Sequence, residues 1–530
     1  MTSYTEILYF LIFLPIVILA YYLVPKKYKH VVLLIASYIF FYSISGKLVL
    51  WIIFSTLSIH HFGLWFKSED NKLKEELLVE NCNKKLIKEK FKKKRKRILL
   101  LAIFIHFGLL VFFKYLPFFS ENINVILKLL KVDFRIQLPL IVAPIGISFY
   151  TLQALSYIVD VYNKKIEADD CLGRLALYLA FFPTVMEGPI ARYSDVANDL
   201  WSNKKLEYKN LCFGYQRILF GLMKKIVIAN RLNSAVTIIY EGWSFHNDGG
   251  IFFLGAVLYT IMLYSEFSGT ADVIIGSGEI FGVKIPENFK QPFFSKTISE
   301  FWTRWHISLG SWLKDYIFYP VATSAFVKKI TTITRKKFGN YFGVLVSTSI
   351  AFFLVWLFNG LWHGAGWRYI AFGMYHFMLI FLGNLFEPLS RKITDKLHIN
   401  RNNYIFKFFQ SFKVFLFVCI GELIFRSLGL KASMYMIKNI ILNFSVKYIF
   451  SNNFYSLGLD IHEIVIVLIT IIIMFIIGIL KEKNINIRQK ISEKHIVIRW
   501  AIYYLLIFYI IIFGAYGAGY ISLDPIYANF

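Results

Sequence analysis

The chain is poor in charge and in cysteine, and both shortages exclude whole classes of protein. Charged residues make up 17% of its 530 residues, whereas a soluble domain averages roughly one quarter. The cysteines stand far apart and form no Cys-x-x-Cys pair, so neither a disulfide framework nor a cysteine zinc site is indicated. They are Cys82, Cys171, Cys212 and Cys419.

Several catalytic and binding signatures are also missing. Among the ionisable residues within apolar segments, no two histidines or carboxylates recur at i, i+4 in the zincin manner, and there is no Gly-x-Ser-x-Gly elbow. The net charge of +26 does not indicate nucleic-acid binding. Lysine and arginine cluster in short segments between apolar runs, as the positive-inside rule predicts, and no nucleic-acid motif occurs. We therefore expect no metal, no bound cofactor and no nucleic-acid partner.

What the chain has in abundance is apolar sequence. Hydrophobic residues account for 57% and aromatic residues for 18%, and the mean hydropathy is +0.56. Apolar runs of roughly 18–22 residues recur from end to end, each long enough to cross about 30 Å of hydrocarbon as a helix. Because lipid offers no partner to a free backbone N–H, such runs must be helical. The sequence predicts an all-α polytopic membrane protein with about 11–14 spanning or re-entrant helices.

Basic segments indicate how the chain is oriented. The run from Ile7 to Val24 is preceded by Glu6 and followed by Pro25-Lys26-Lys27, so we expect a retained first span with its N-terminus outside. Residues 67–97, which end in KEKFKKKRKR, are the most polar segment. They predict a helical cytoplasmic loop that contacts anionic lipid.

Two later segments do not look like simple spans. Leu172 to Ile190 is apolar but rich in proline and glycine and contains Glu187, which favours a re-entrant piece enclosed by protein. Leu211 to Ile239 carries four basic side chains within apolar sequence, and we interpret it as an amphipathic helix rather than a span.

Two stretches place histidine in apolar, aromatic surroundings. Residues 299–319 read SEFWTRWHISLGSWLKDYIFY and contain His306, and residues 358–376 read FNGLWHGAGWRYIAFGMYH and contain His363. At about 100° per residue, residues 299–319 form one helix with His306 on its aromatic face. Ionisable groups inside a membrane are costly and rare, which makes both histidines functional candidates.

A neutral histidine in a dry, glycine-lined pocket suits proton transfer, because its ordinary pKa lies near working pH. Gly364 and Gly366 would allow a substrate to approach His363 closely. From the residues alone, three interpretations of His363 stay open. It is a base in a membrane enzyme, a proton relay in a transporter, or a buried packing residue.

The motifs around these histidines resemble those of the membrane-bound O-acyltransferase family, in particular its alginate and peptidoglycan O-acetyltransferase-like branch. The resemblance extends from about Leu138 to the end of the chain. Its motifs are specific in combination. They are Pro144-Ile145-Gly146-Ile147-Ser148-Phe149, Phe182-Pro183, Gly188-Pro189-Ile190-Ala191-Arg192-Tyr193, Pro286-Glu287-Asn288-Phe289, Glu300-Phe301-Trp302-Thr303-Arg304-Trp305-His306-Ile307-Ser308-Leu309, Asp315-Tyr316 and Gly360-Leu361-Trp362-His363-Gly364-Ala365.

The resemblance implies a fold of tilted helices around a central funnel and three regions. Residues 1–137 would be N-terminal transmembrane helices, 138–400 the catalytic core, and 401–530 C-terminal transmembrane helices with an outward-facing tail. It implies catalytic roles for His363 and His306. Glu266 stands where relatives often have aspartate. The residues implied to shape the tunnel or orient groups are Arg304, Asp315, Trp302, Trp305, Trp362, Asn288 and Glu266.

For function, the resemblance implies an acetyltransferase of the bacterial cytoplasmic membrane. An acetyl group held as a cytoplasmic thioester, such as acetyl-CoA, would pass across the membrane to a cell-envelope or secreted polysaccharide. Transfer would be direct or through an extracytoplasmic acetyltransferase partner. The alternative is D-alanyl transfer from a carrier protein to teichoic acid, whose enzymes Gly373-Met374-Tyr375-His376 also resembles. The ending Asp524 to Phe530 resembles a short Tyr-x-x-Phe terminus, so Tyr527 is a candidate acyl relay.

Overall fold

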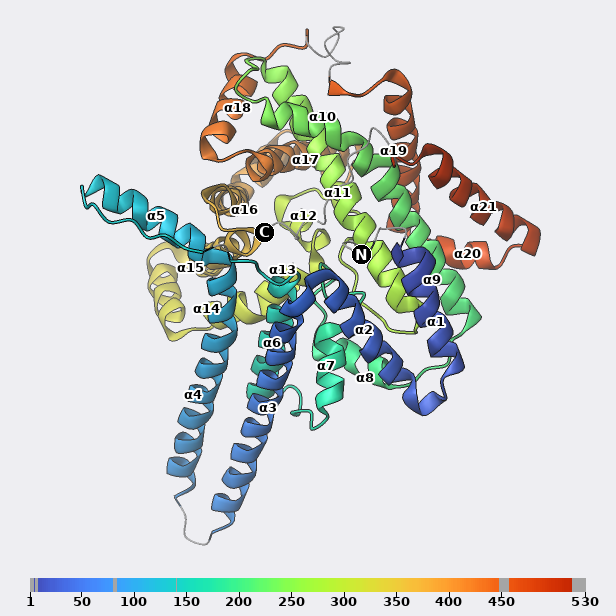
Figure 1. The fold of residues 1–530 in the computed structure, drawn as a ribbon. Helices are drawn as coiled ribbons and strands as arrows, with labels where there is room; N and C mark the ends of the chain where they lie inside the picture. Colours follow the sequence, from blue (N-terminus) through green and yellow to red (C-terminus); the bar gives the residue numbers. More distant parts are fainter. Residues whose placement is uncertain (1–3, 5–7, 80–82, 140, 448–456, 517–530) are drawn as a thin grey trace. The chain divides into compact units, whose positions relative to one another are not determined.

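The computed structural model describes residue 4 and residues 8–79, 83–139, 141–447 and 457–516. These residues form helices joined by loops, and no β-strand occurs among them (Figure 1). Eight helical stretches within them are long and apolar enough to cross a membrane. The predicted all-α, multi-pass membrane fold is confirmed.

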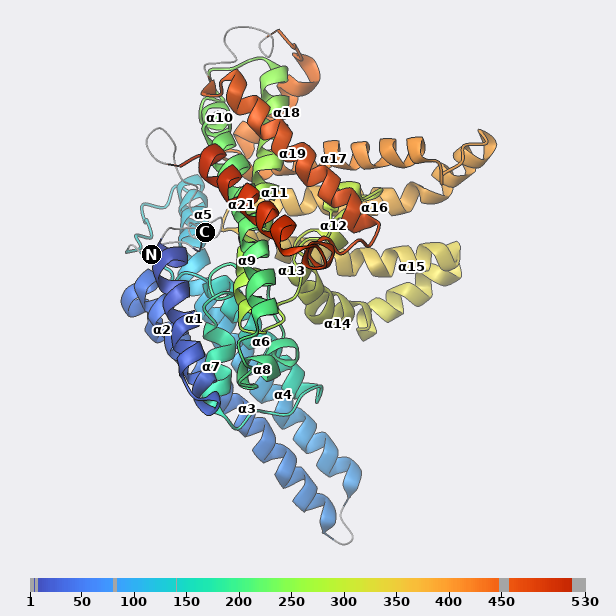
Figure 2. The same ribbon diagram turned by 90° about the vertical axis from the view of Figure 1, so that its right-hand side faces the viewer.

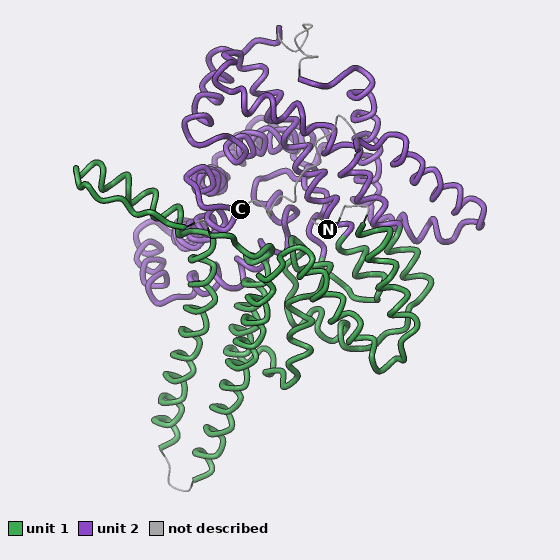
Figure 3. The backbone as a smooth tube through the Cα atoms, viewed as in Figure 1, with its two compact units in different colours: residues 1–215, 274–286, 524–530 green, residues 216–273, 287–523 purple. Residues whose placement is uncertain are grey.

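The chain divides into two compact units (Figure 3). Unit 1 contains residues 1–215 and 274–286, and unit 2 contains residues 216–273 and 287–523. The helices of unit 1 are η1 (Tyr9–Phe13), α1 (Leu14–Leu23), η2 (Lys26–Tyr28), α2 (Lys29–Ser45), η3 (Gly46–Leu48), α3 (Val49–Leu78), α4 (Lys84–Leu110), η4 (Val111–Tyr115), α5 (Leu116–Leu129), α6 (Ile147–Tyr162), α7 (Leu172–Ala180) and α8 (Tyr193–Trp201).

Helices α3 and α4 lie side by side as a long hairpin in unit 1 (Figures 1 and 2). Their polar ends correspond to the predicted cytoplasmic loop, of which residues 67–78 and 84–97 are helical, as expected. Lys94 lies 2.8 Å from Glu69, and Arg95 pairs with Asp70. Cross-pairing of this kind neutralises the acidic side chains of α3 and leaves the surplus positive charge of α4 facing outward.

The segment from Leu172 to Ile190, predicted to be a re-entrant piece, is not one continuous helix. Its helical part, α7, ends at Ala180, and the residues that follow up to Ile190 are buried without helical structure. Backbone of this kind is tolerated at membrane depth only when protein encloses it.

Unit 2 holds both candidate histidines. Helices α9 and α11 begin or end in unit 1, and the others lie within unit 2. In chain order they are α9 (Tyr208–Leu222), η5 (Met223–Ala229), α10 (Asn230–Glu241), α11 (Gly249–Ile280), η6 (Pro292–Phe294), α12 (Ile298–Arg304), α13 (Ile307–Leu313), η7 (Lys314–Phe318), α14 (Tyr319–Ala322), α15 (Ala325–His363), α16 (Trp367–Lys396), α17 (Tyr404–Arg426), α18 (Leu430–Leu442), α19 (Ile461–Glu482), α20 (Ile487–Ser492) and α21 (Ile496–Phe513).

Helices α15 and α16 pack along each other and bring His363 to the join between them. The bend in α15 visible in Figure 2 lies at Gly339, whose φ of 87° and ψ of 172° are not helical. The packing of α15 against α16 requires glycine, because a Cβ on Gly373 would lie 2.3 Å from the carbonyl oxygen of Trp356. Backbones approach this closely in membrane helices only through small residues.

Leu211 to Ile239 is helical and is not one of the eight candidate spans, as predicted, but its basic side chains do not lie on a surface. Lys224 and Lys225 are each 3% exposed and Arg231 is 5% exposed. Their charges turn toward protein partners instead of a surface. The spacing of the basic residues along this helix therefore reflects buried ion pairs, since a charge without a partner is too costly to bury.

Candidate active site

The segment that carries His306 is not one continuous helix, so that prediction is wrong. Helix α12 ends at Arg304, Trp305 is extended, and α13 begins only at Ile307. His306 itself has φ 48° and ψ 51°, the left-handed conformation that costs a non-glycine residue roughly 1–2 kcal/mol. A conformation of this kind persists only where surrounding contacts hold it, and such residues cluster at functional sites.

Asn288 supplies those contacts. Its backbone carbonyl accepts a hydrogen bond from the N–H of Ile307 at 3.0 Å. Its side-chain Oδ1 accepts from the backbone N–H of Ser308 at 3.2 Å and from the Ser308 hydroxyl at 2.9 Å. The same Oδ1 lies 3.2 Å from His306 Nδ1.

This arrangement fixes the tautomer of His306. A backbone N–H can only donate, so the atom of Asn288 that faces Ser308 must be the amide oxygen. His306 Nδ1 therefore carries a proton and donates it to Asn288, which leaves Nε2 as the accepting nitrogen of the ring. Burial also holds the pKa of His306 well below its usual range, so the ring is neutral at pH 7.

His363 is the last residue of α15. The turn after it is tight, because a Cβ on Gly364 would lie 2.1 Å from the ring of Tyr369 and a Cβ on Gly360 would lie 2.4 Å from the Tyr369 carbonyl oxygen. The glycines beside His363 thus let Tyr369 at the start of α16 close onto the end of α15. This contact fixes the position of the His363 backbone.

The two histidines come together in the structure. Their ring centroids are 6.5 Å apart. The Trp362 ring lies edge-on to both, 5.6 Å from His306 and 5.1 Å from His363. Phe267 lies 4.8 Å from His306 and Phe425 lies 5.2 Å from His363. Aromatic walls therefore surround both imidazole rings.

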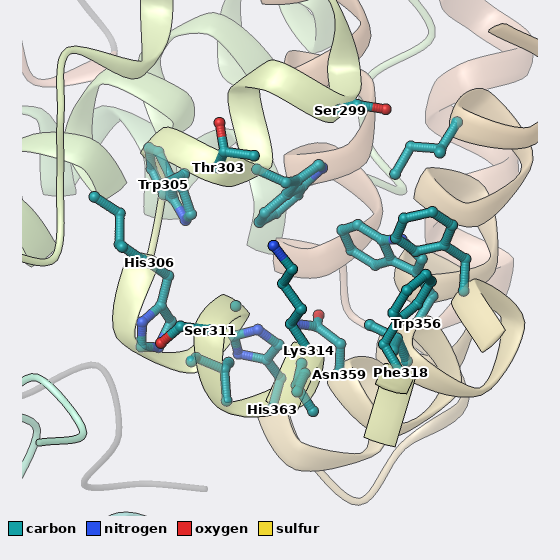
Figure 4. A pocket seen from close by; sticks show the side chains of 18 residues that line it. Ser299, Thr303, Trp305, His306, Ser311, Lys314, Phe318, Trp356, Asn359 and His363 are labelled. Atoms are coloured by element: carbon teal, nitrogen blue, oxygen red, sulfur yellow. The ribbon is translucent and has the colours of Figure 1, made fainter. Parts of the chain in front are cut away.

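Both histidines line one pocket of about 420 Å³ (Figure 4). Its walls are largely aromatic and include Trp302, Trp305 and Trp356. A pocket of this size, mostly apolar with a few polar groups, is typical of a small-molecule site.

The predicted tunnel residues fall into three groups. Trp302 and Trp305 line the pocket. Trp362 and Asn288 contact His306 from outside it. The other three lie outside the pocket lining, and their roles stay predictions. They are Arg304, Asp315 and Glu266.

Arg304 and Glu266 take part in ion pairs. Arg304 lies 2.9 Å from Glu300 and 2.6 Å from Glu482. Glu266 pairs with Lys225, both almost fully buried. Asp315 lies in η7, and Tyr527 lies outside the described residues.

Several polar residues that were not among the predicted site residues also line the pocket, and they include Lys314 and Asn359 (Figure 4). Asn359 precedes His363 by four residues, so the two share one face of α15. The third buried histidine of the region, His376, accepts a hydrogen bond from Trp302 Nε1 at 3.3 Å. Among the residues described, no three His, Cys, Asp or Glu side chains gather as a metal site would require.

The depressed pKa of His306 predicts a pH effect on stability. The unfolded chain takes up a proton below a pKa of about 6.5 while the folded state keeps the ring neutral, so stability falls as pH drops through this value. Between pH 7.5 and pH 5.5, the apparent melting temperature of the detergent-solubilised protein should fall less in His306→Gln than in the wild type. Equal falls in the two proteins would contradict the prediction.

Comparisons with known proteins identify the family of this chain. Residues 172–334, which include His306, match the model of the MBOAT, membrane-bound O-acyltransferase family. A probable alginate O-acetylase AlgI of Pseudomonas syringae pv. tomato is 33% identical over 416 residues, which cover 78% of this chain and 70% of the relative. The chain belongs to the membrane-bound O-acyltransferase family. It is therefore an acyltransferase enzyme and a multi-pass membrane protein.

Other members of the family are also similar to this chain. The peptidoglycan O-acetyltransferase of Helicobacter pylori is 30% identical over 324 residues, 56% of each chain. The teichoic acid D-alanyltransferase of Bacillus subtilis is 32% identical over 289 residues, 53% of this chain and 68% of the relative. The membrane-bound O-acyltransferase resemblance found in the sequence is thus confirmed.

Proposed function

We propose that this membrane-bound O-acyltransferase moves an acetyl group from a cytoplasmic thioester donor across the membrane, for O-acetylation of an envelope or secreted polysaccharide. The observation that carries the proposal is the pair of histidines, 6.5 Å apart between ring centroids, on one aromatic pocket. Similarity to alginate and peptidoglycan O-acetylating enzymes favours acetyl as the group transferred.

The chemistry needs a base that is neutral before the reaction. In the proposed step, His363 accepts the proton of the acceptor hydroxyl while the hydroxyl oxygen attacks the thioester carbonyl carbon. The C–O bond forms, the C–S bond breaks, and the proton passes to the departing thiolate. General-base catalysis of this kind contributes typically 10²–10⁴-fold in rate, about 3–5 kcal/mol of barrier.

The role of His306 differs from that of His363. Its Nδ1 is committed to Asn288, so only Nε2 can accept a hydrogen bond from a bound group. A fixed neutral ring of this type orients a substrate and polarises the site without changing its own charge. We propose that His306 positions the reacting groups for His363.

The donor and the acceptor follow from the same proposal. Acetyl-CoA is the donor, and a glycan on the outer side receives the acetyl group directly or through an extracytoplasmic acetyltransferase partner. We place the enzyme in the bacterial cytoplasmic membrane, in contact with anionic lipid on its basic side.

The test is the content of base-labile acetate in peptidoglycan and in secreted polysaccharide, measured in cells with and without the gene. Loss of acetate from one fraction, restored by the wild-type gene, is the expected result. Unchanged acetate in every fraction would refute the proposal.

D-alanyl transfer to teichoic acid is the second candidate, favoured by similarity to the Bacillus subtilis enzyme. The two candidates separate in the same cells. Loss of ester-linked D-alanine with unchanged acetate would favour the second. A transporter is disfavoured, because the chain belongs to an acyltransferase family.

Tyr527 remains a proposed acyl relay. Its phenol would carry the acetyl group as an ester between the thioester and the final acceptor. Removal of the hydroxyl in Tyr527→Phe is expected to reduce acetyl transfer, measured as glycan acetate. Undiminished transfer by this variant would exclude the relay.

A further inference from the structure

Two arginines lie at the ends of α16 and α17 nearest to His363, and neither forms an ion pair with a described residue. Arg368 is in the first turn of α16, and Arg426 is the last residue of α17. Other partly buried arginines of unit 2 have carboxylate partners, as Arg217 and Arg304 do. Because ionisable groups within a membrane protein are costly and mark functional sites by default, these two guanidinium groups need an explanation.

The two arginines are held near one another. Arg368 Nη1 donates a hydrogen bond at 2.7 Å to the carbonyl oxygen of Ser427, the residue that follows Arg426. Its Nη2 donates at 2.7 Å to the hydroxyl of Tyr369, and that hydroxyl interacts electrostatically with both arginines. The guanidinium of Arg426 lies over the ring of Tyr240, 5.5 Å from its centroid. The adjoining ends of α16 and α17 therefore present two positive charges together.

This arginine pair lies behind the aromatic wall of His363. Phe425, which precedes Arg426, has its ring 5.2 Å from His363. The ring of Tyr369, which follows Arg368, lies 5.1 Å from Phe425. A molecule with a hydroxyl at His363 can therefore place another of its groups at the arginines when it has about the length of a sugar unit.

The charge distribution along the same helices assigns the arginine pair to the outer side of the membrane. Helices α16 and α17 pack along each other (Figure 2). Their opposite ends meet at residues 391–401, which contain four basic residues and one acidic residue. By the positive-inside rule, that end faces the cytoplasm. The end with Arg368 and Arg426 then faces outward, where a polysaccharide acceptor is found.

Contact with lipid phosphates does not explain Arg426. Its neighbours at the end of α17 are enclosed by protein, since Phe425 is 7% exposed and Ser427 is fully buried. Tyr369, which faces it from α16, is 4% exposed. Long basic side chains that reach lipid headgroups do so from helix ends that border the membrane surface. The partly exposed guanidinium of Arg426 instead lies in a region framed by protein.

Three further features bear on the charge at this place. The positive end of the α16 dipole adds to the charge of Arg368 in its first turn. The hydroxyl of Tyr240, under Arg426, is buried and makes no hydrogen bond to a described residue. Glu422, one turn before Arg426, is 1% exposed and offsets at most one of the two positive charges. The site is therefore suited to an anion that also accepts hydrogen bonds.

We propose that Arg368 and Arg426 bind an anionic group of the acceptor, so that the acceptor is an acidic polysaccharide. Guanidinium groups recognise carboxylate and phosphate oxygens through paired, charge-assisted hydrogen bonds. A guanidinium has five N–H donors, of which Arg368 uses one for Ser427 and one for Tyr369. The others remain for an anion. The carboxylate of a uronic acid and the phosphate of a phosphorylated sugar are the two sources of that anion.

The inference rests on the proposed function and is tested with a set of small acceptors. Detergent-solubilised enzyme and acetyl-CoA are given methyl glucoside, which is neutral, methyl glucuronide, which has a carboxylate, or methyl glucoside 6-phosphate. The acetyl ester formed gives kcat/KM for each acceptor. The wild type is expected to prefer an anionic acceptor to methyl glucoside by about tenfold or more. The better of the two anionic acceptors identifies the source of the anion.

Variants of the arginines should lower this preference. Arg426→Gln and Arg368→Gln should each reduce it. Arg426→Lys should keep part of it, because lysine retains the charge and loses the planar fork. Arg426→Glu should make the anionic acceptors worse than methyl glucoside. The matched control is Arg391→Gln, which changes a largely exposed arginine of α16 and should keep the full preference.

The outcomes separate the two claims. If the wild type forms no acetyl hydroxamate from acetyl-CoA and hydroxylamine, a small neutral acceptor, the proposed function fails. If it forms the hydroxamate but accepts neutral and anionic sugars equally, or if Arg426→Gln keeps the preference, the inference is wrong. Stronger inhibition by a peptide with a free carboxyl end than by methyl glucuronide would assign the site to a partner protein instead. Because each ratio compares two acceptors on one preparation, loss of folded protein cannot imitate the expected result.

Discussion

Replacement of His363 by alanine is expected to lower acetyl transfer by roughly a thousandfold, while the protein stays folded. The size of this fall in rate follows from the loss of a general base, which typically contributes 10²–10⁴-fold to the rate. The drop should appear in kcat more than in KM, because the proton moves only in the transition state. The measurement is thiol release from acetyl-CoA by the purified enzyme, together with glycan acetate in cells.

The matched control is His462→Ala. His462 is exposed on α19, so this variant should transfer acetyl at the wild-type rate. His306→Gln should fall between the two, because it loses the ring that positions the reacting groups and keeps the base. An active His363→Ala enzyme would assign the proton transfer to another group and would remove the basis of the mechanism.

The largest expected loss of stability comes from Glu266→Gln. Lys225 and Glu266 have side chains only 4% and 2% exposed, and they form an ion pair with each other. Removing one partner leaves a charge buried without compensation, which costs about 3–5 kcal/mol. We expect a marked fall in the apparent melting temperature, followed by fluorescence-detected size-exclusion chromatography after heating.

The double variant Lys225→Met/Glu266→Gln should recover most of that loss, because no buried charge is left unpaired. The control is Glu387→Gln, since the pair of Glu387 with Arg391 is 2.7 Å long but largely exposed. It should change the free energy of unfolding by less than about 1 kcal/mol. A Glu266→Gln protein as stable as this control would show that the buried pair contributes nothing to folding.

The helical class and the two histidines were predictable from the sequence for a physical reason. Long apolar runs must be helical in lipid, and an ionisable residue within such a run is rare enough to be a functional candidate. The break at His306 was not predictable in the same way. Periodicity assumes an uninterrupted helix, whereas the left-handed conformation of His306 is held by Asn288, eighteen residues earlier in the chain.

The partners in the buried ion pairs were also not predictable from local sequence. Lys225 finds Glu266 forty-one residues away, so neither residue identifies its partner through local spacing. The basic side chains of 211–239 therefore resembled a surface helix. Asn359 was missed for a different reason, since an uncharged amide in an apolar run is unremarkable until the pocket around it is known.

The contact between α15 and α16 also limits how this protein can be stabilised by sequence design. Alanine is the strongest helix former, and replacing a helical glycine by alanine usually gains about 1 kcal/mol. At Gly360 and Gly373 the added methyl would meet carbonyl oxygens at 2.4 Å and 2.3 Å. Both positions lie on the contact between α15 and α16 near His363, so a design scheme that scores helix propensity alone would select substitutions that displace His363.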